Sequence, residues 1–175
     1  MTLAFTRNWN DKMPKHLIGK PTHFPERIWQ SIDDEDNSSR EEFESYFKQN
    51  FDILMSNPFG FDFKKTYHPK LHTIREDKNN RWKPGNDIHF VVNNRRPDRF
   101  QFAPVIKCLS TQEIKILHSG EKWRQPWVFV DGAILTGPEI DVLAQNDGFD
   151  FTSDFFAYFN TDFTGKIIHW TNLEY

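Results

Sequence analysis

Short stretches of alternating apolar and polar residues, broken by Gly, Pro and Asp, make up most of this sequence and determine its fold class. Such stretches predict β-strands. They are residues 2–7, 87–92, 99–117 and 165–173. In WVFVDGAIL, Asp131 and Gly132 stand between two apolar arms, which predicts a two-residue hairpin. Helical patterns occur only towards the two ends of the sequence, without regular strand–helix–strand alternation, so we expect an α+β domain or a small closed β-barrel.

The helices are predicted from their start signals. Pro25 opens PERIWQSI, with Ile28 on the apolar face. Thr136 and Glu139 have the spacing of a capping box and predict a second helix. A third short helix is expected over SDFFAYF, residues 153–159, with its phenylalanines against the core.

Length and composition limit the class of protein. A chain of 175 residues closes one sizeable core, so we predict a single domain over residues 1–175. The one cysteine, Cys108, excludes an internal disulfide and fits a reducing compartment, so we expect a cytoplasmic protein. No apolar run approaches the roughly 20 residues of a membrane span. The histidines are scattered, and we expect no metal site and no other cofactor.

Charge is distributed unevenly along the chain. The net charge of −3 argues against a protein that coats nucleic acid through bulk electrostatics. Residues 61–110, however, carry 11 Lys or Arg against 5 Asp or Glu, whereas both flanking segments are acidic. A local basic patch can face an anion while the whole protein stays acidic. A solvated loop region would have the same composition, so both interpretations stay open.

The run KLHTIR lies within this basic segment and carries groups suited to chemistry. If the run is extended, Thr73 and Arg75 point to one side and His72 and Ile74 to the other, and Lys70 needs a bend to join Thr73. A partly desolvated lysine has a lowered pKa and can activate a threonine hydroxyl. The guanidinium of Arg75 offers a planar fork for a phosphate or a base edge. An ordinary strand can carry the same residues, so spacing alone does not decide.

Other segments of the sequence add to the evidence from the KLHTIR spacing. HPKLHTIRED followed by NRWKPGNDIHF, with GKPTHFPERIW near the start and NDGF ahead of the last helix, resembles the ASCH superfamily of phage and bacterial type. The family signature is a Lys-x-x-Thr-x-Arg run, then an aromatic residue, a Gly-Asp-type turn and a strand. The pattern continues through Ser110, Gln112 and Ile114. The resemblance covers most of residues 2–173, with an insertion at about 33–66, and implies a PUA-like fold, a small β-barrel flanked by short helices.

The resemblance also implies a function. ASCH domains have RNA-linked roles, which implies recognition of RNA or a modified nucleoside. Some members are small amidohydrolases that remove acyl groups from N4-acylated cytidines. In those enzymes a Lys and a Thr of the motif act with a downstream acidic residue. By position in the motif they correspond here to Lys70, Thr73 and Asp147, and the family has Glu where this chain has Asp147. Asn86 stands where the family often has Asp after the turn Gly, a departure that concerns the shape of the turn.

Ligand contacts besides Arg75 are expected from neighbouring residues. Trp82, beside Arg81 and Lys83, either stacks on a base or pins the turn to the barrel. Arg95 and Arg96 either hold phosphates or form a solvated hairpin tip.

Three functions stay open on the sequence. The first is binding of RNA or a modified nucleoside at KLHTIR, and the second is hydrolysis of a small amide by the same residues. The third is an accessory protein of phage or mobile-element origin that binds another protein through an aromatic loop at residues 58–67. The oligomeric state is not determined by the sequence.

Overall fold

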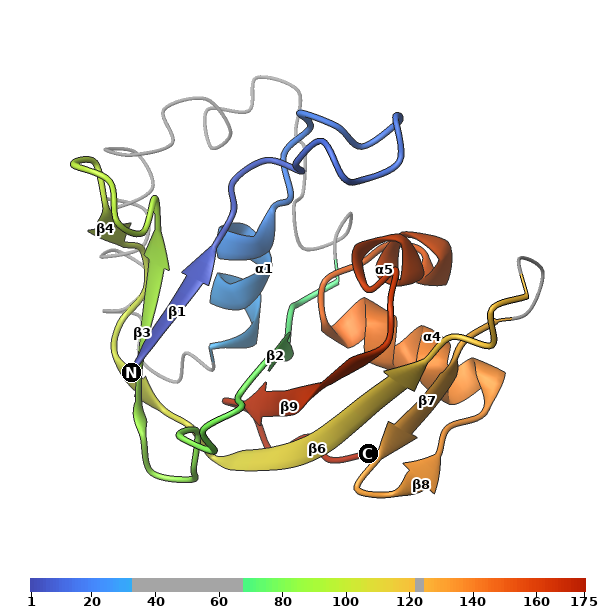
Figure 1. Cartoon of the computed structure of the whole chain (residues 1–175). Helices are drawn as coiled ribbons and strands as arrows, with labels where there is room; N and C mark the ends of the chain where they lie inside the picture. Colours follow the sequence, from blue (N-terminus) through green and yellow to red (C-terminus); the bar gives the residue numbers. More distant parts are fainter. Residues whose placement is uncertain (33–67, 122–124) are drawn as a thin grey trace.

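Two β-sheets and three helices form the part of the chain that the computed structural model describes, residues 1–32, 68–121 and 125–175 (Figure 1). The strands are β1 Thr2–Phe5, β2 His72–Arg75, β3 Asp87–Val92, β4 Phe100–Gln101, β5 Ile106–Lys107, β6 Ser110–Leu117, β7 Trp127–Val130, β8 Ala133–Ile134 and β9 Phe163–His169. The helices are α1 Phe24–Ser31, α4 Gly137–Asn146 and α5 Thr152–Tyr158. The predicted α+β class is confirmed. The strands of the described ranges form two separate sheets and not one closed barrel.

The smaller sheet is built around β3. β1 pairs with β3 in parallel, whereas β4 and β5 pair with it antiparallel. The sequence predicted one extended region over residues 99–117, but the structure divides it into β4, β5 and β6. Pro104 lies in the break between β4 and β5, as expected for a residue that lacks the N–H of a central strand.

The larger sheet is antiparallel throughout, in the order β2-β9-β6-β7-β8. Its edge strand β2 holds most of the KLHTIR run and pairs with β9, so that His72 lies opposite His169. The predicted hairpin is confirmed at β7 and β8, where Asp131 and Gly132 have φ of 48° and 85°. Positive φ at both turn positions is the geometry that a two-residue loop requires.

The helices begin where the sequence predicted. Helix α1 carries a proline in its first turn, and α4 has the complete capping box between Thr136 and Glu139. In Figure 1, α4 and α5 lie along the larger sheet, whereas α1 lies beside β1. Leu143 of α4, Phe155 of α5 and Ile114 of β6 are all fully buried in one core cluster.

Some predictions concern residues outside the described ranges. The insertion at about 33–66 and the aromatic loop at 58–67 both lie there. The organisation as one domain stays a prediction. Among the helices of the described ranges, none is long and apolar enough to cross a membrane.

Gly165 of β9 provides a test of how closely β9 and β2 pack. A Cβ at this position would fall onto the carbonyl oxygen of Arg75 and the ring of Phe163. We therefore expect Gly165→Ala to lower the free energy of unfolding in a urea titration by about 1–3 kcal/mol, the usual cost of overpacking. Gly137→Ala is the matched control, because a Cβ there meets nothing within 4 Å. An equal loss in both variants would contradict the close contact.

Candidate functional site

The end of helix α4 covers the free edge of β2. The backbone N–H of Leu71 donates to the carbonyl of Asn146 at 2.8 Å, and Asp147 is the C-cap of the helix. Gly148 follows with φ of 90°, and a Cβ there would lie 3.2 Å from Cδ of Lys70. The KLHTIR and NDGF strings, far apart in the sequence, are therefore in direct contact.

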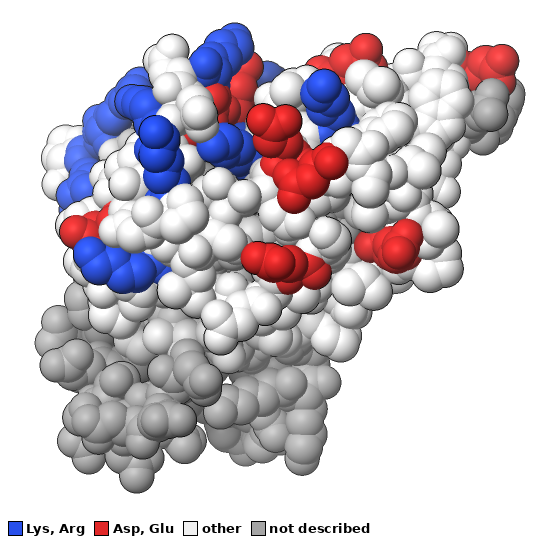
Figure 2. All heavy atoms as spheres, turned by 90° about the horizontal axis from the view of Figure 1, so that it is seen from below, with Lys and Arg blue, Asp and Glu red and all other residues white. Residues whose placement is uncertain are grey.

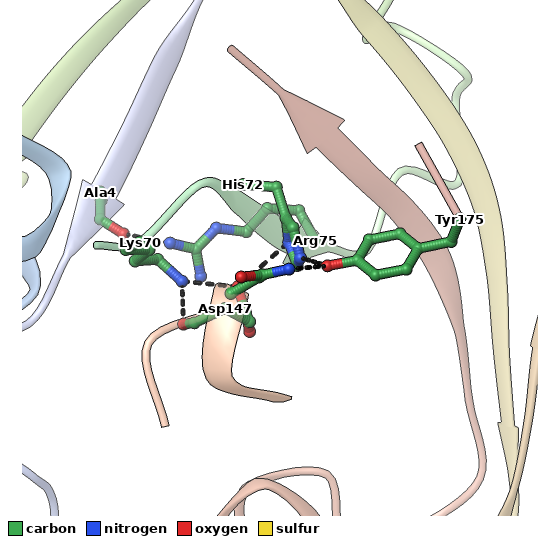
Figure 3. A network of polar contacts seen from close by, with 7 residues as sticks. Ala4, Lys70, His72, Arg75, Asp147 and Tyr175 are labelled. Atoms are coloured by element: carbon green, nitrogen blue, oxygen red, sulfur yellow. Dashed lines mark hydrogen bonds and ion pairs between the residues drawn. The ribbon is translucent and has the colours of Figure 1, made fainter. Parts of the chain in front are cut away.

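Lys70 and Asp147 form a buried ion pair at this junction (Figure 3). Nζ of Lys70 lies 2.5 Å from Oδ1 of Asp147 and also donates to the Asp147 carbonyl. The side chains of Lys70 and Asp147 are only 2% and 5% exposed. Nζ further lies 4.8 Å from the centre of the Phe24 ring, within range of a cation–π contact. The structure thus brings together two of the three residues implied as catalytic.

Burial changes the acid–base properties of this pair. It lowers the pKa of Lys70 to about 8, although the carboxylate of Asp147 opposes the shift. Burial likewise raises the pKa of Asp147, against the opposing effect of Lys70 and a backbone hydrogen bond from Ile74. Both shifts favour the neutral forms, because removing a charge from water is costly. A proton is therefore easier to remove from Lys70 than from an exposed lysine.

Arg75 lies close to this pair (Figure 3), whereas Thr73 is not hydrogen-bonded to it within the described ranges. Alternation along β2 puts Thr73 on the face opposite His72. Nη2 of Arg75 donates to the Ala4 carbonyl at 2.8 Å, and its guanidinium lies 5.0 Å from the Phe5 ring. Arg75 therefore joins the two sheets, and its charge lowers the pKa of both Lys70 and Asp147.

A polar network that the sequence did not predict extends from Asp147 to Tyr175 (Figure 3). Nδ2 of Asn146 donates to the Tyr175 hydroxyl at 2.9 Å, and that hydroxyl lies 2.7 Å from Nε2 of His72. Since the hydroxyl accepts from Asn146, it can donate its own proton to Nε2, which leaves the His72 proton on Nδ1. Nδ1 lies 3.7 Å from Oδ1 of Asp147.

His169 stands beside His72 on the same face of the sheet. The rings are 5.4 Å apart, and both residues are 0% exposed. Burial lowers the pKa of His169 to about 4, and burial together with the charge of Lys70 lowers the pKa of His72 well below its usual value. Both rings are therefore neutral at neutral pH. The described ranges contain no group of three His, Cys, Asp or Glu residues that could hold a metal ion.

The turn between β2 and β3 holds three further residues of the predicted site. Trp82 is 5% exposed and belongs to the core, so its ring could stack on a base only if the turn opened. Arg81 and Lys83 are exposed on the same turn. The two carboxylate oxygens of Asp77 accept the N–H groups of Arg81 and Trp82 at 3.0 and 2.8 Å, and Oδ1 of Asn86 accepts that of Lys83 at 2.9 Å. These bonds fix the shape of the turn.

Arg95 and Arg96 are exposed in the loop after β3, where Arg95 has φ of 66°. In the part of the chain described, neither contacts Lys70 or Asp147. Figure 2 shows one face of the molecule on which Lys and Arg side chains gather towards one side, apart from most of the acidic ones.

A cavity of about 200 Å³ lies next to the ion pair. Gly148, Phe149 and the buried Arg27 are among its lining residues, but Lys70, Thr73 and Asp147 are not. Gly148 lines the cavity and lies close to the stem of Lys70, so the cavity and the ion pair are near neighbours.

No protein-family model matches the chain, and searches of curated proteins and of solved structures give no match either. The functional inference therefore depends on the site itself. Its distinguishing parts are the Lys70–Asp147 ion pair, the exposed basic turn and the polar network that reaches Tyr175.

The burial of His169 predicts loss of stability in acid. Its pKa is about 4 in the folded chain against a usual value of 6.5, so the unfolded chain takes up the proton first as pH falls. The stability contributed by neutral His169 is complete above pH 6.5 and is lost as pH falls towards about 4, by up to about 3 kcal/mol. Urea unfolding between these pH values measures this loss.

Two variants isolate the contribution of His169. His169→Gln should reduce the dependence of unfolding free energy on pH, because it removes one of two buried titrating rings and leaves His72. His68→Gln, at an exposed position, should leave the dependence unchanged. The same pH slope in His169→Gln as in the wild type would show that another group is responsible.

Proposed function

We propose that this chain is an ASCH-type domain of PUA-like architecture that binds RNA or a modified nucleoside. The observation that carries the proposal is the exposed basic turn, which lies next in sequence to β2 and its KLHTIR run. Arg81 and Lys83 project from this turn, and the turn is held by Asp77 and Asn86. Cations on a fixed turn suit a phosphate, because less conformational freedom is lost on binding.

The resemblance of the KLHTIR and NDGF strings to ASCH domains supports the same proposal. In this proposal the basic turn contacts the phosphate backbone of RNA without reading the base sequence. Arg95 and Arg96 are further candidates for phosphate contacts. The nucleoside is recognised at the junction of β2 and α4, where the buried His72 and Asp147 and the half-buried Asn146 supply polar groups. Arg75 positions this junction through its bond to Ala4.

The phosphate contacts can be tested with labelled short RNAs in fluorescence anisotropy. We expect Arg81→Ala/Lys83→Ala to weaken binding about tenfold at low salt and to reduce the slope of log K against log salt by about one to two. Lys12→Ala/Lys15→Ala removes two other exposed charges and serves as the control. Equal affinity in the two double variants, or no RNA binding by the wild type, would refute the phosphate role.

A second candidate function is hydrolysis of a small amide such as an N4-acylated cytidine. The specific observation in its favour is the pKa of about 8 for Lys70, with Asp147 at 2.5 Å. A lysine that loses its proton near neutral pH can accept one from an attacking hydroxyl or water. Within the described ranges Thr73 has no hydrogen bond to Lys70 or Asp147, which weighs against Thr73 as the nucleophile unless the strand rearranges.

Release of acetate from N4-acetylcytidine tests this candidate. We expect turnover to rise with pH through about 8, as Lys70 becomes neutral. Lys70→Ala alone leaves a buried carboxylate without its partner and costs about 3–5 kcal/mol, so the fold must be checked. Lys70→Met/Asp147→Asn removes both charges together and should fold without activity, whereas Lys12→Ala should keep full activity. Turnover in the folded double variant, or none in the wild type, would exclude the mechanism.

A further inference from the structure

Tyr175 fills a slot between the larger sheet and the end of α4, and every polar group of this residue that faces the slot is bound. The side-chain amide of Gln112 makes two of these bonds: Nε2 donates to the Tyr175 carbonyl at 2.9 Å, and Oε1 accepts the Tyr175 N–H at 3.0 Å. The hydroxyl of Tyr175 takes the other two, with Asn146 and His72 (Figure 3). Three side chains from three elements therefore hold Tyr175, Gln112 by its main chain and Asn146 and His72 by its hydroxyl.

The amide of Gln112 is fixed in orientation independently of Tyr175. Gln112 is 7% exposed, and Nε2 also donates to Oδ2 of Asp131 at 3.0 Å. The other carboxylate oxygen of Asp131 accepts the N–H of Glu113 at 2.7 Å. Because one N–H of Nε2 is bound to Asp131 on the β7–β8 hairpin, the other N–H and Oε1 face the slot. A side-chain amide held in this way is also the group that pairs with adjacent donor and acceptor atoms on the edge of a base.

The walls of the slot are planar and carry buried nitrogens without hydrogen-bond partners. The Tyr175 ring meets His72 edge-on at 5.4 Å and lies 6.2 Å from His169. Within the described ranges, neither ring nitrogen of His169 nor Nδ1 of His72 has a hydrogen-bond partner, although both residues are 0% exposed. Buried polar atoms that lack partners are uncommon, because each one loses its bonds to water. They point to a ligand more polar than the tyrosine ring.

We propose that this slot is the base-binding part of the site, and that Tyr175 is its intramolecular occupant. The inference rests on the proposed function, since it names the part of the ligand that the site recognises. The ligand class is a pyrimidine with adjacent N–H and C=O groups, as in uracil. Gln112 pairs with that edge, the rings of His72 and His169 contact the base, and Asn146 binds a remaining carbonyl. Tyr175 competes with the base, and it lowers the apparent affinity by the fraction of molecules in which it occupies the slot.

Binding of uridine to a variant that ends at Glu174, measured by isothermal titration calorimetry, tests the proposal, because this deletion removes the ring of Tyr175 and also the main-chain N–H and C=O that Gln112 binds. We expect uridine to bind about tenfold or more tightly than it binds the wild type, because the competitor is gone. Gln112→Leu in the background of this deletion should abolish the gain. Arg81→Ala/Lys83→Ala in the same background should retain it, because uridine carries no phosphate. A gain in uridine binding without any RNA binding by the wild type would uphold the slot and reject the phosphate surface.

4-Methylphenol is the comparison ligand, since any cavity left by a tyrosine can admit it. Uridine binding that depends on Gln112 supports the proposal. Binding of 4-methylphenol without uridine, or uridine binding that persists in Gln112→Leu, overturns it. If the deletion variant gives no urea unfolding transition, Tyr175→Phe is used: it removes the two hydroxyl contacts and keeps the ring, and it should bind uridine a few-fold more tightly. Unchanged uridine affinity in the folded variant overturns the proposal as well.

Discussion

The ion pair between Lys70 and Asp147 is the interaction on which the arrangement of the site depends. Two charges buried at a junction are tolerated only when each neutralises the other and further hydrogen bonds complete their shells. Here the carboxylate of Asp147 is bound by Lys70 and by the N–H of Ile74, so α4 cannot leave the edge of β2 without breaking both contacts. The same contact covers an edge strand whose N–H groups would otherwise be unpaired. The end of α4, and with it Asn146, is thereby held against His72.

This arrangement explains why binding is better supported than catalysis. Burial gives Lys70 the lowered pKa of a base, but the pair also encloses its amine, which is directed at Asp147 and not into the neighbouring cavity. Thr73, the expected nucleophile, is not hydrogen-bonded to either member of the pair within the described ranges. A catalytic role therefore requires a rearrangement at β2. Recognition of a base requires only that Tyr175 leave its slot.

Local features of the fold were predictable from the sequence, whereas features that depend on strand register were not. The Asp131–Gly132 hairpin and the Thr136–Glu139 capping box are settled by hydrogen bonds within a few residues, and both were predicted correctly. The contact of Lys70 with Asp147 required the resemblance, because no local pattern joins residues so far apart. His169 and Tyr175 were missed altogether. Their positions follow from the pairing of β2, β9 and β6, which alternation within a single strand does not reveal.

The register also explains why polar groups collect at one end of an otherwise apolar sheet face. His72, His169 and Ser110 lie in one row across three strands, because each stands directly opposite the next. Further along the same face come Ile114 and Ile167, both fully buried. If this end of the sheet served stability alone, apolar side chains would do better there than two neutral imidazoles with unpaired nitrogens. The polar row, the fixed amide of Gln112 and the end of α4 lie next to one another, and in our proposal a ligand supplies the hydrogen bonds that the buried nitrogens lack.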